Sequence, residues 1–183
     1  MTVLDIYNLA LSVFKEPPVT EVELENKSGH NIEVLSLFYQ PALLKARDEY
    51  SWSWLEDVIE LSEIEQKIKG YDYSYQLPQG QIKITEIIPR NVEYRKIGNK
   101  LYSKQAIDTV IGIKTDTITP DNLNIPEEFW ILVAYAMAFL ASESMSNNDQ
   151  VMIQVVSSKY NSYLEQMKLT DAMTGIRNIC QIE

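Results

Sequence analysis

The chain has 183 residues, of which 45% are apolar and 23% are charged, and these values are typical of a globular protein with about one domain's worth of core. Sixteen Lys and Arg residues stand against 26 Asp and Glu residues, which gives a net charge of −10 at pH 7 and argues against non-specific nucleic-acid binding. The single cysteine, Cys180, excludes an intrachain disulfide and a thiolate-cage zinc site.

A helix is predicted over residues 2–16. Thr2 and Asp5 have the spacing of a capping box, with Asp in the place of the usual Glu. Pro17 and Pro18 end the helix, because proline has no backbone N–H to continue it. One apolar stripe with the period of a helix runs along the segment and comprises Val3, Tyr7, Ala10 and Phe14.

A second helix is predicted over residues 31–55, after an acidic loop or short extended link at 19–27. Its apolar residues keep a helical period, and Pro41 is expected to kink it or restart it. Trp52 and Trp54 close the segment. Side chains of that size must be largely buried, so we interpret both as core aromatics in preference to a platform that stacks a base or a ligand.

Residues 71–118 are predicted to form a small β insertion of three to five short antiparallel strands. Tyr71, Tyr73 and Tyr75 alternate with other residues, as in a half-buried strand. Gly98-Asn99 is predicted to be the turn of a hairpin. So few strands need a helical layer over one face. The segment holds seven basic and five acidic residues in an acidic chain, which suggests a contact surface.

Two further helices are predicted over residues 127–146 and 149–174, followed by a tail at 175–183. Residues 129–141 form the longest unbroken apolar run, and a helix that is apolar all round must be buried all round. Either the other helices wrap it, or one of its faces meets another subunit. In the second case the candidate oligomer-interface residues are aromatic: Phe129, Tyr135, Phe139, Tyr160 and Tyr163.

These elements predict one domain over residues 1–183 of the α+β, mainly α class. The expected architecture is a bundle of about four helices with a small antiparallel β insertion. The apolar run at 129–141 is shorter than the roughly 20 residues of a membrane span, and no signal peptide is visible. We therefore expect a soluble protein that is made in the cytoplasm.

No pattern in the sequence predicts a catalytic, cofactor-binding or metal-binding site. The six glycines are too scattered for a phosphate-binding loop. A Ser–His or Cys–His pair could use only His30, which follows Gly29 and is interpreted as a surface residue. Adjacent acidic residues such as Glu127 and Glu128 diverge on a helix and do not converge on a substrate. The sequence therefore predicts a protein that is not an enzyme.

Six segments follow one another in an order that is similar to a known family. They are a first helix with its proline turn, an aromatic segment with Trp52 and Trp54, a Tyr-Gln-Leu-Pro passage before an apolar strand, a hairpin, an Ile-Pro-Glu-Glu-Phe start to an Ala-rich helix, and a last helix with paired Tyr. Their residue numbers are 2–18, 47–54, 75–87, 93–102, 125–141 and 158–172. In this order they resemble the tail tubular protein A family of short-tailed bacteriophages, which are head-to-tail adaptor, head completion or gatekeeper ring proteins.

The resemblance implies a structural virion protein of the tail or neck, present in the host cytoplasm during assembly and needing no cofactor. It implies a homo-oligomeric ring of twelve copies below the portal protein, which joins the capsid to a tail nozzle or another tail protein. Genomic DNA would pass through the channel of this connector during genome ejection without sequence-specific binding, and no membrane is a partner. Net acidity suits such a conduit, because a wall that repels phosphate lets DNA slide.

Two other functions stay open. A small carboxylate-dependent hydrolase would need two Asp or Glu side chains held about 5–10 Å apart across a pocket, and the sequence offers no such pair. A peptide-binding module that uses Trp52 and Trp54 would be a monomer at every concentration.

Overall fold

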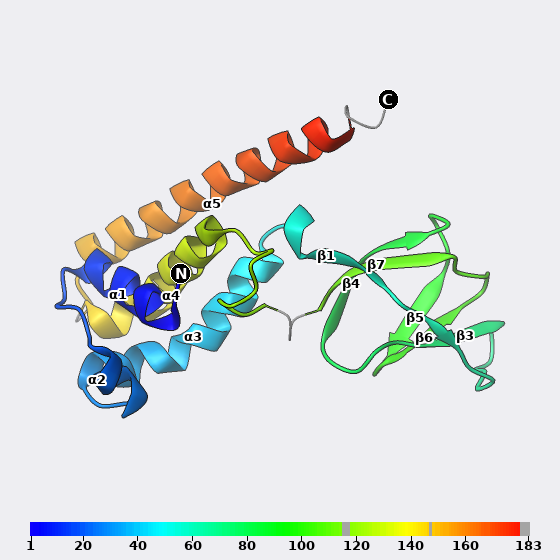
Figure 1. Cartoon of the computed structure of the whole chain (residues 1–183), viewed down its shortest axis with the longest axis horizontal. Coiled ribbons are helices and arrows are strands. Elements are labelled where there is room, and N and C mark those ends of the chain that lie inside the picture. The colour runs from blue at the N-terminus through cyan, green and yellow to red at the C-terminus, as the bar shows by residue number, and fades with distance from the viewer. Residues whose placement is uncertain (115–117, 147, 180–183) are drawn as a thin grey trace. The chain divides into compact units, whose positions relative to one another are not determined.

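The computed structural model of the chain describes residues 1–114, 118–146 and 148–179 (Figure 1). The chain divides into two compact units. The helical unit comprises Met1–Ser53 and Pro120–Glu183, and the β unit comprises Trp54–Thr119. The division is based on how densely residues contact one another, not on whether each unit folds alone. The single domain over residues 1–183 therefore stays a prediction.

The helical unit contains α1 (Val3–Phe14), α2 (Glu21–Glu25), α3 (His30–Asp48), α4 (Glu127–Met145) and α5 (Gln150–Ile179). A capping box begins α1: the Thr2 hydroxyl accepts the Asp5 N–H at 3.2 Å, and the Asp5 carboxylate accepts the Thr2 N–H at 2.7 Å. This confirms the predicted start of the helix. Thr20 and Glu23 form a second capping box at α2, so the segment predicted as a loop or extended link contains a short helix.

α4 is the central helix of the helical unit, and α1, α3 and α5 each pack against it (Figure 1). Ten of its side chains are buried, so the other helices do wrap the apolar run. By length and composition alone α4 is able to cross a membrane, and it is the one such helix in the described part of the chain. Its 18-residue window has a mean hydropathy of 1.2 and is 56% buried within the fold, as is common for core helices.

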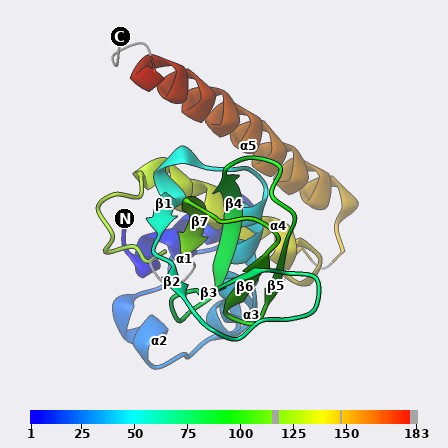
Figure 2. The ribbon, with the colours of Figure 1, turned by 90° about the vertical axis from the view of Figure 1, so that its right-hand side faces the viewer.

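Two helix ends differ from the predicted ones. α3 continues through Pro41 and ends at Asp48, so Trp52 lies outside it and Trp54 lies in the 3₁₀ turn η1 (Ser53–Leu55). α5 is one unbroken helix that continues through Gly175 to Ile179, so the predicted tail is helical up to that residue (Figure 2). A single glycine costs a helix about 1 kcal/mol relative to alanine, which is too little to end a helix of 30 residues. Residues 180–183 of the tail lie outside the described residues.

The β unit contains seven strands within the described residues: β1 (Glu56–Ile59), β2 (Ser62–Glu63), β3 (Tyr73–Gln76), β4 (Ile82–Ile88), β5 (Tyr94–Ile97), β6 (Lys100–Ser103) and β7 (Thr109–Lys114). They pair antiparallel in two sheets, one in the order β1-β7-β4 and the other in the order β2-β3-β6-β5. The predicted hairpin is confirmed as β5 and β6. Gly98 has a φ of 59°, the positive value that the first central residue of a type II′ turn requires.

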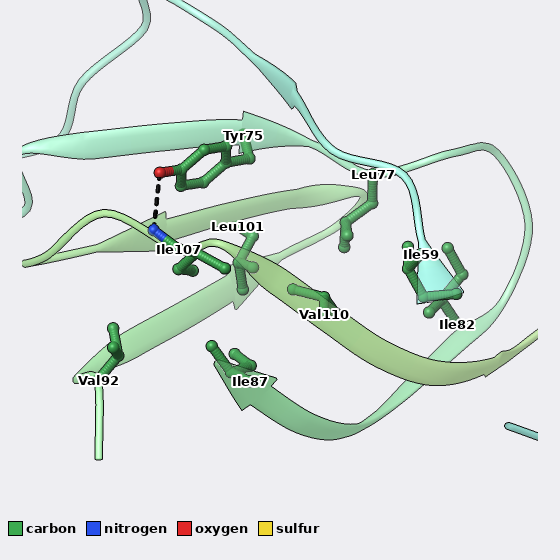
Figure 3. Close-up of a cluster of buried hydrophobic side chains, with 9 residues drawn as sticks. All are labelled: Ile59, Tyr75, Leu77, Ile82, Ile87, Val92, Leu101, Ile107 and Val110. Atoms are coloured by element: carbon green, nitrogen blue, oxygen red, sulfur yellow. Dashed lines mark hydrogen bonds between the residues drawn. The ribbon is translucent and has the colours of Figure 1, made fainter. Parts of the chain in front are cut away.

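Strands of both sheets contribute to one apolar core of the β unit (Figure 3). Its nine buried residues are Ile59, Tyr75, Leu77, Ile82, Ile87, Val92, Leu101, Ile107 and Val110. The Tyr75 hydroxyl accepts a hydrogen bond from the backbone N–H of Ile107 at 3.0 Å. The one polar side-chain atom in the cluster therefore has a partner (Figure 3). On β7, a Cβ at Gly112 would lie only 2.7 Å from the carbonyl oxygen of Lys83, so the close approach of β4 depends on the glycine.

The predicted mainly helical fold class is wrong. The structure has 49% helix and 18% strand, with two antiparallel sheets, and is therefore a mixed α/β protein with substantial sheet. The predicted insertion at 71–118 contains β3 to β7 but omits the first two strands. β1 and β2 are short and carry charged residues on exposed positions, so they lack the apolar alternation by which a strand is recognised.

Candidate interaction surfaces

The five predicted interface residues lie in the helical unit on α4 and α5, but not all of them are at its surface. Phe129 and Tyr160 are 0% and 2% exposed. Both fill the core of the unit and have no surface to offer another subunit. Tyr135, Phe139 and Tyr163 are half-buried, and for these three an interface role stays a prediction.

Tyr160 and Phe139 belong to a cluster that joins three helices. Their rings stack with centroids 5.3 Å apart, and the Lys45 ammonium of α3 lies 5.2 and 5.6 Å from the two ring centroids. Lys45 also pairs with Glu49, whose carboxylate accepts the Tyr160 hydroxyl at 3.1 Å. The hydrogen bond from Lys45 is the largest cause that lowers the pKa of Glu49, and burial raises the pKa of Tyr160. At neutral pH both shifts favour an ionised Glu49 carboxylate and a protonated Tyr160 hydroxyl, the pair that this hydrogen bond joins.

Tyr135 and Tyr163 meet edge to face, with ring centroids 5.3 Å apart, at a shallow groove of about 270 Å³ beside α5. Ser158, Lys159, Ser162 and Gln166 complete its lining. Burial, followed by the nearby Glu128, raises the pKa of Tyr163 to about 12. The groove lacks the pair of facing carboxylates that hydrolysis of a glycoside requires.

Trp52, predicted as a core aromatic, is fully buried, and its indole N–H donates to the Ala46 carbonyl at 2.8 Å. Trp54 is half-buried. Between the two, Ser53 is held by the buried Asp171 of α5, whose carboxylate accepts the Ser53 N–H at 3.2 Å and the Ser53 hydroxyl at 2.5 Å. The full burial of Trp52 removes it from any peptide-binding or base-stacking platform.

The outer face of α5 is a surface that the sequence analysis did not identify. One face of the helix is buried through Val156, Tyr160, Leu164, Met167 and Asp171. On the opposite face, exposed residues repeat every three or four positions and none is charged: Val151, Val155, Ser158, Ser162, Gln166, Leu169 and Met173. We call these seven residues the outer stripe. Over 30 residues the helix extends for about 45 Å, so the stripe is long enough to accept a neighbouring chain.

The β unit has a different open surface, at the edge of its four-stranded sheet. All four residues of the edge strand β5 are exposed, and they include Arg95 and Lys96 beside Tyr94 and Ile97. An edge strand presents unpaired backbone groups, and basic side chains on it discourage indiscriminate pairing with other strands.

No group of three His, Cys, Asp or Glu residues within the described ranges is arranged to hold a metal ion. His30 is an exposed residue at the start of α3. Cys180 lies outside the described residues.

No protein-family model matches the chain. No curated protein matches it either.

Proposed function

We propose that this chain is the subunit of a head-to-tail adaptor ring in a short-tailed bacteriophage, positioned between the portal protein and the tail. The ring is a homo-oligomer, expected to have twelve copies, through which genomic DNA passes. The proposal starts from the order of motifs in the sequence. It assigns a structural role in the virion and no catalytic step.

The observation that carries the proposal is the outer stripe of α5. A helix packed on one face only, with an uncharged and partly apolar face opposite, is suited to bury that face against another protein. Four of its members are large apolar side chains that are at least 44% exposed: Val151, Val155, Leu169 and Met173. The subunit therefore has surface available for assembly without rearrangement of its core.

The charge distribution is consistent with a channel wall. The helical unit has sixteen acidic and seven basic residues, whereas the β unit has ten acidic and nine basic residues. An acidic lining disfavours the phosphate contacts by which proteins hold DNA. We therefore expect the helical unit to contribute the larger part of the channel surface.

The experiment is negative-stain imaging of the protein mixed with its portal protein. Wild-type protein should add a ring of density to one side of the portal. The double variant Val151→Asp/Leu169→Asp places two charges on the outer stripe and should fail to form the ring, while its thermal melting stays close to that of the wild type. A portal that gains no density from the wild-type protein would contradict the proposal.

Leu123→Asp is the matched control, because Leu123 is 97% exposed and lies outside the outer stripe. It introduces one aspartate at an apolar surface position, where the double variant introduces two, and should leave the ring intact. Loss of the ring in this control would mean that any added charge prevents assembly, and the outer stripe would then have no special part in it.

A further inference from the structure

The outer stripe of α5 is symmetric about its middle residue, Ser162. Its seven members are 4, 3, 4, 4, 3 and 4 positions apart along the chain, and this order of spacings is the same in both directions. It corresponds to two repeats of 11 residues, with a period of about 3.67 residues per turn, so the stripe stays on one side of a nearly straight helix. The exposed apolar residues lie at both ends of the stripe, and its three polar residues lie in the middle.

This symmetry makes the outer stripe complementary to a second copy of itself that runs in the opposite direction. With the pairing centred on Ser162, the opposed side chains are Val151 with Met173, Val155 with Leu169, Ser158 with Gln166, and Ser162 with itself. Apolar side chains therefore meet apolar ones, and polar side chains meet polar ones. In each pair of unlike residues a smaller side chain meets a larger one, which is how packed surfaces interdigitate.

The groove beside α5 lies at the centre of this contact. Its volume is about 270 Å³, and Ser158, Ser162 and Gln166 of the outer stripe line it together with Tyr135, Lys159 and Tyr163. In the antiparallel arrangement Gln166 of the second copy lies opposite Ser158, at the mouth of the groove. Its amide group both donates and accepts hydrogen bonds, and the hydroxyl groups in the lining are suitable partners for it. The hollow left by the two serines would therefore receive a longer side chain from the second copy.

The charges beside the outer stripe favour antiparallel over parallel pairing. Lys159 and Glu165 are exposed three positions before and three positions after Ser162. In an antiparallel pair each lies level with the opposite charge of the second copy, whereas in a parallel pair like charges lie level. Residues 150–173 hold two basic and two acidic side chains, so the contact has no net charge. The acidity of the chain resides on other parts of its surface, and salt screens repulsion beyond about 8 Å at physiological ionic strength.

We propose that the outer stripes of two copies of this chain pair antiparallel in solution, about a two-fold axis at Ser162. A second copy is favoured over nucleic acid because the stripe contains no basic side chain, and over a membrane because its middle is polar. The stripe measures about 33 Å by about 10 Å in projection, well below the roughly 800 Å² that each partner buries in a standard stable interface. The pairing is therefore reversible and depends on protein concentration.

The pairing does not rest on the proposed ring, but it bears on how that ring forms. A two-fold contact closes at two copies, so it cannot by itself build a ring of twelve. While two copies are paired, each covers the outer stripe of the other. The pair must therefore open before the stripe becomes available for assembly on the portal.

Disulfide formation between introduced cysteines locates the axis, in a Cys180→Ser background. Ser162→Cys should give a linked dimer on mild oxidation, because its two copies face each other. Ser158→Cys alone should not, since its copies are displaced by about 12 Å along the helix and a disulfide spans a Cα distance of about 4.4–6.8 Å. A mixture of Ser158→Cys with Gln166→Cys should give a linked mixed dimer. Linkage of Ser158→Cys to itself as readily as that of Ser162→Cys would overturn the antiparallel pairing.

Sedimentation velocity over a range of protein concentrations measures the pairing without a cross-link. The wild type should show a monomer–dimer equilibrium, and Ser162→Asp should weaken it at least tenfold, because two carboxylates then lie opposite each other. Asn161→Asp is the matched control: it adds the same charge one position away, at an exposed residue outside the outer stripe, and should dimerise like the wild type. Added salt should leave the dimer unchanged or favour it. A wild type that is monomeric at every concentration, or equal weakening by both variants, would overturn the pairing.

The outcomes of these experiments separate the pairing from the adaptor function. Dimers in solution with no ring on the portal would leave the pairing in place and overturn the function. A ring formed by a protein that never dimerises would overturn the pairing and leave the function in place. The oxidised Ser162→Cys dimer should add no ring to the portal, and a reductant should restore the ring. Ring formation by the linked dimer would contradict the requirement that the pair opens first.

Discussion

The two units of this chain are stabilised by different kinds of core. In the helical unit aromatic rings meet edge to face: the ring centroid of Phe129 lies 5.5 Å from that of Trp130 and 6.3 Å from that of Trp52. In the β unit the nine core residues include a single aromatic ring, that of Tyr75. The other eight are aliphatic side chains on strands and their connections. Large aromatic side chains bury more area each, so single truncations should cost the helical unit more.

The units also differ in charge, and this difference changes how the acidity of the whole chain is interpreted. The net charge of −10 arises almost entirely from the helical unit, since the β unit has nearly equal numbers of acidic and basic residues. The charge of the whole chain therefore describes the helical unit and not the β unit, which is nearly neutral. Four measurements compare the units further.

The largest effect is expected from Phe129→Ala in the centre of the helical unit. The side chain is 0% exposed, and truncation of a buried phenylalanine costs about 3–5 kcal/mol of unfolding free energy. Because each unit has its own core, hydrogen exchange should accelerate in α1, α3 and α4 and stay unchanged in β4 and β7. Equal acceleration in both units would mean that they unfold together, as the prediction of one domain requires.

A smaller effect, of about 1–3 kcal/mol, is expected from Gly112→Ala in the β unit. The added methyl group would meet the backbone oxygen of Lys83 at 2.7 Å, and a backbone atom in a paired strand moves less easily than the end of a side chain. Chemical denaturation followed by hydrogen exchange in β4 and β7 measures the loss. Val58→Ala, at an exposed position on β1, is the control and should change stability by less than about 0.5 kcal/mol.

Tyr75→Phe tests the hydrogen bond that a side chain makes within the core cluster of the β unit. It leaves the ring in place and removes the hydroxyl, so the buried N–H of Ile107 loses its acceptor at 3.0 Å. An unsatisfied buried donor costs about 1–3 kcal/mol, and we expect a loss of stability within that range. Tyr94→Phe, on the exposed edge strand, should be neutral in the same denaturation experiment.

The smallest effect is the pH dependence contributed by Glu49. Hydrogen bonds from Lys45 and Tyr160 lower the pKa of Glu49 below its ordinary value of 4.5. The stability that they contribute is therefore fully present above pH 4.5, and it is lost as the pH falls through the lowered pKa. The wild type should lose roughly 1 kcal/mol more stability than Glu49→Gln between pH 7 and pH 3. Glu165→Gln, which alters the exposed pair with Lys168, should titrate like the wild type. Identical pH profiles for the wild type and Glu49→Gln would show that the pair adds nothing.

Local signals in the sequence predicted the helices and the hairpin well. The spacing of Thr2 and Asp5 predicted the start of α1, and α4 begins at Glu127, as the predicted helix over 127–146 does. The same rule would also have found α2, because Thr20 and Glu23 have the spacing of a capping box. The strands of the hairpin are marked by their turn, which is a local feature as well.

The failures concern features that depend on contacts far apart in the sequence. β1 is a strand because it pairs with β7, from Glu56 opposite Ile113 to Ile59 opposite Val110, and its own residues carry no strand pattern. The outer stripe was missed because only the packing of α5 on α4 shows which of its apolar residues remain exposed.

The hydrogen bonds between Ser53 and Asp171 have a consequence for the order of events during synthesis of the chain. Asp171 emerges from the ribosome 118 residues after Ser53, by which time every strand of the β unit has already been translated. The sequence of the β unit is therefore available for strand pairing before Asp171 is able to accept the two hydrogen bonds from Ser53. The helices need α4 and α5 to enclose their aromatic side chains, so the unit whose translation begins first is also the last to be fully translated.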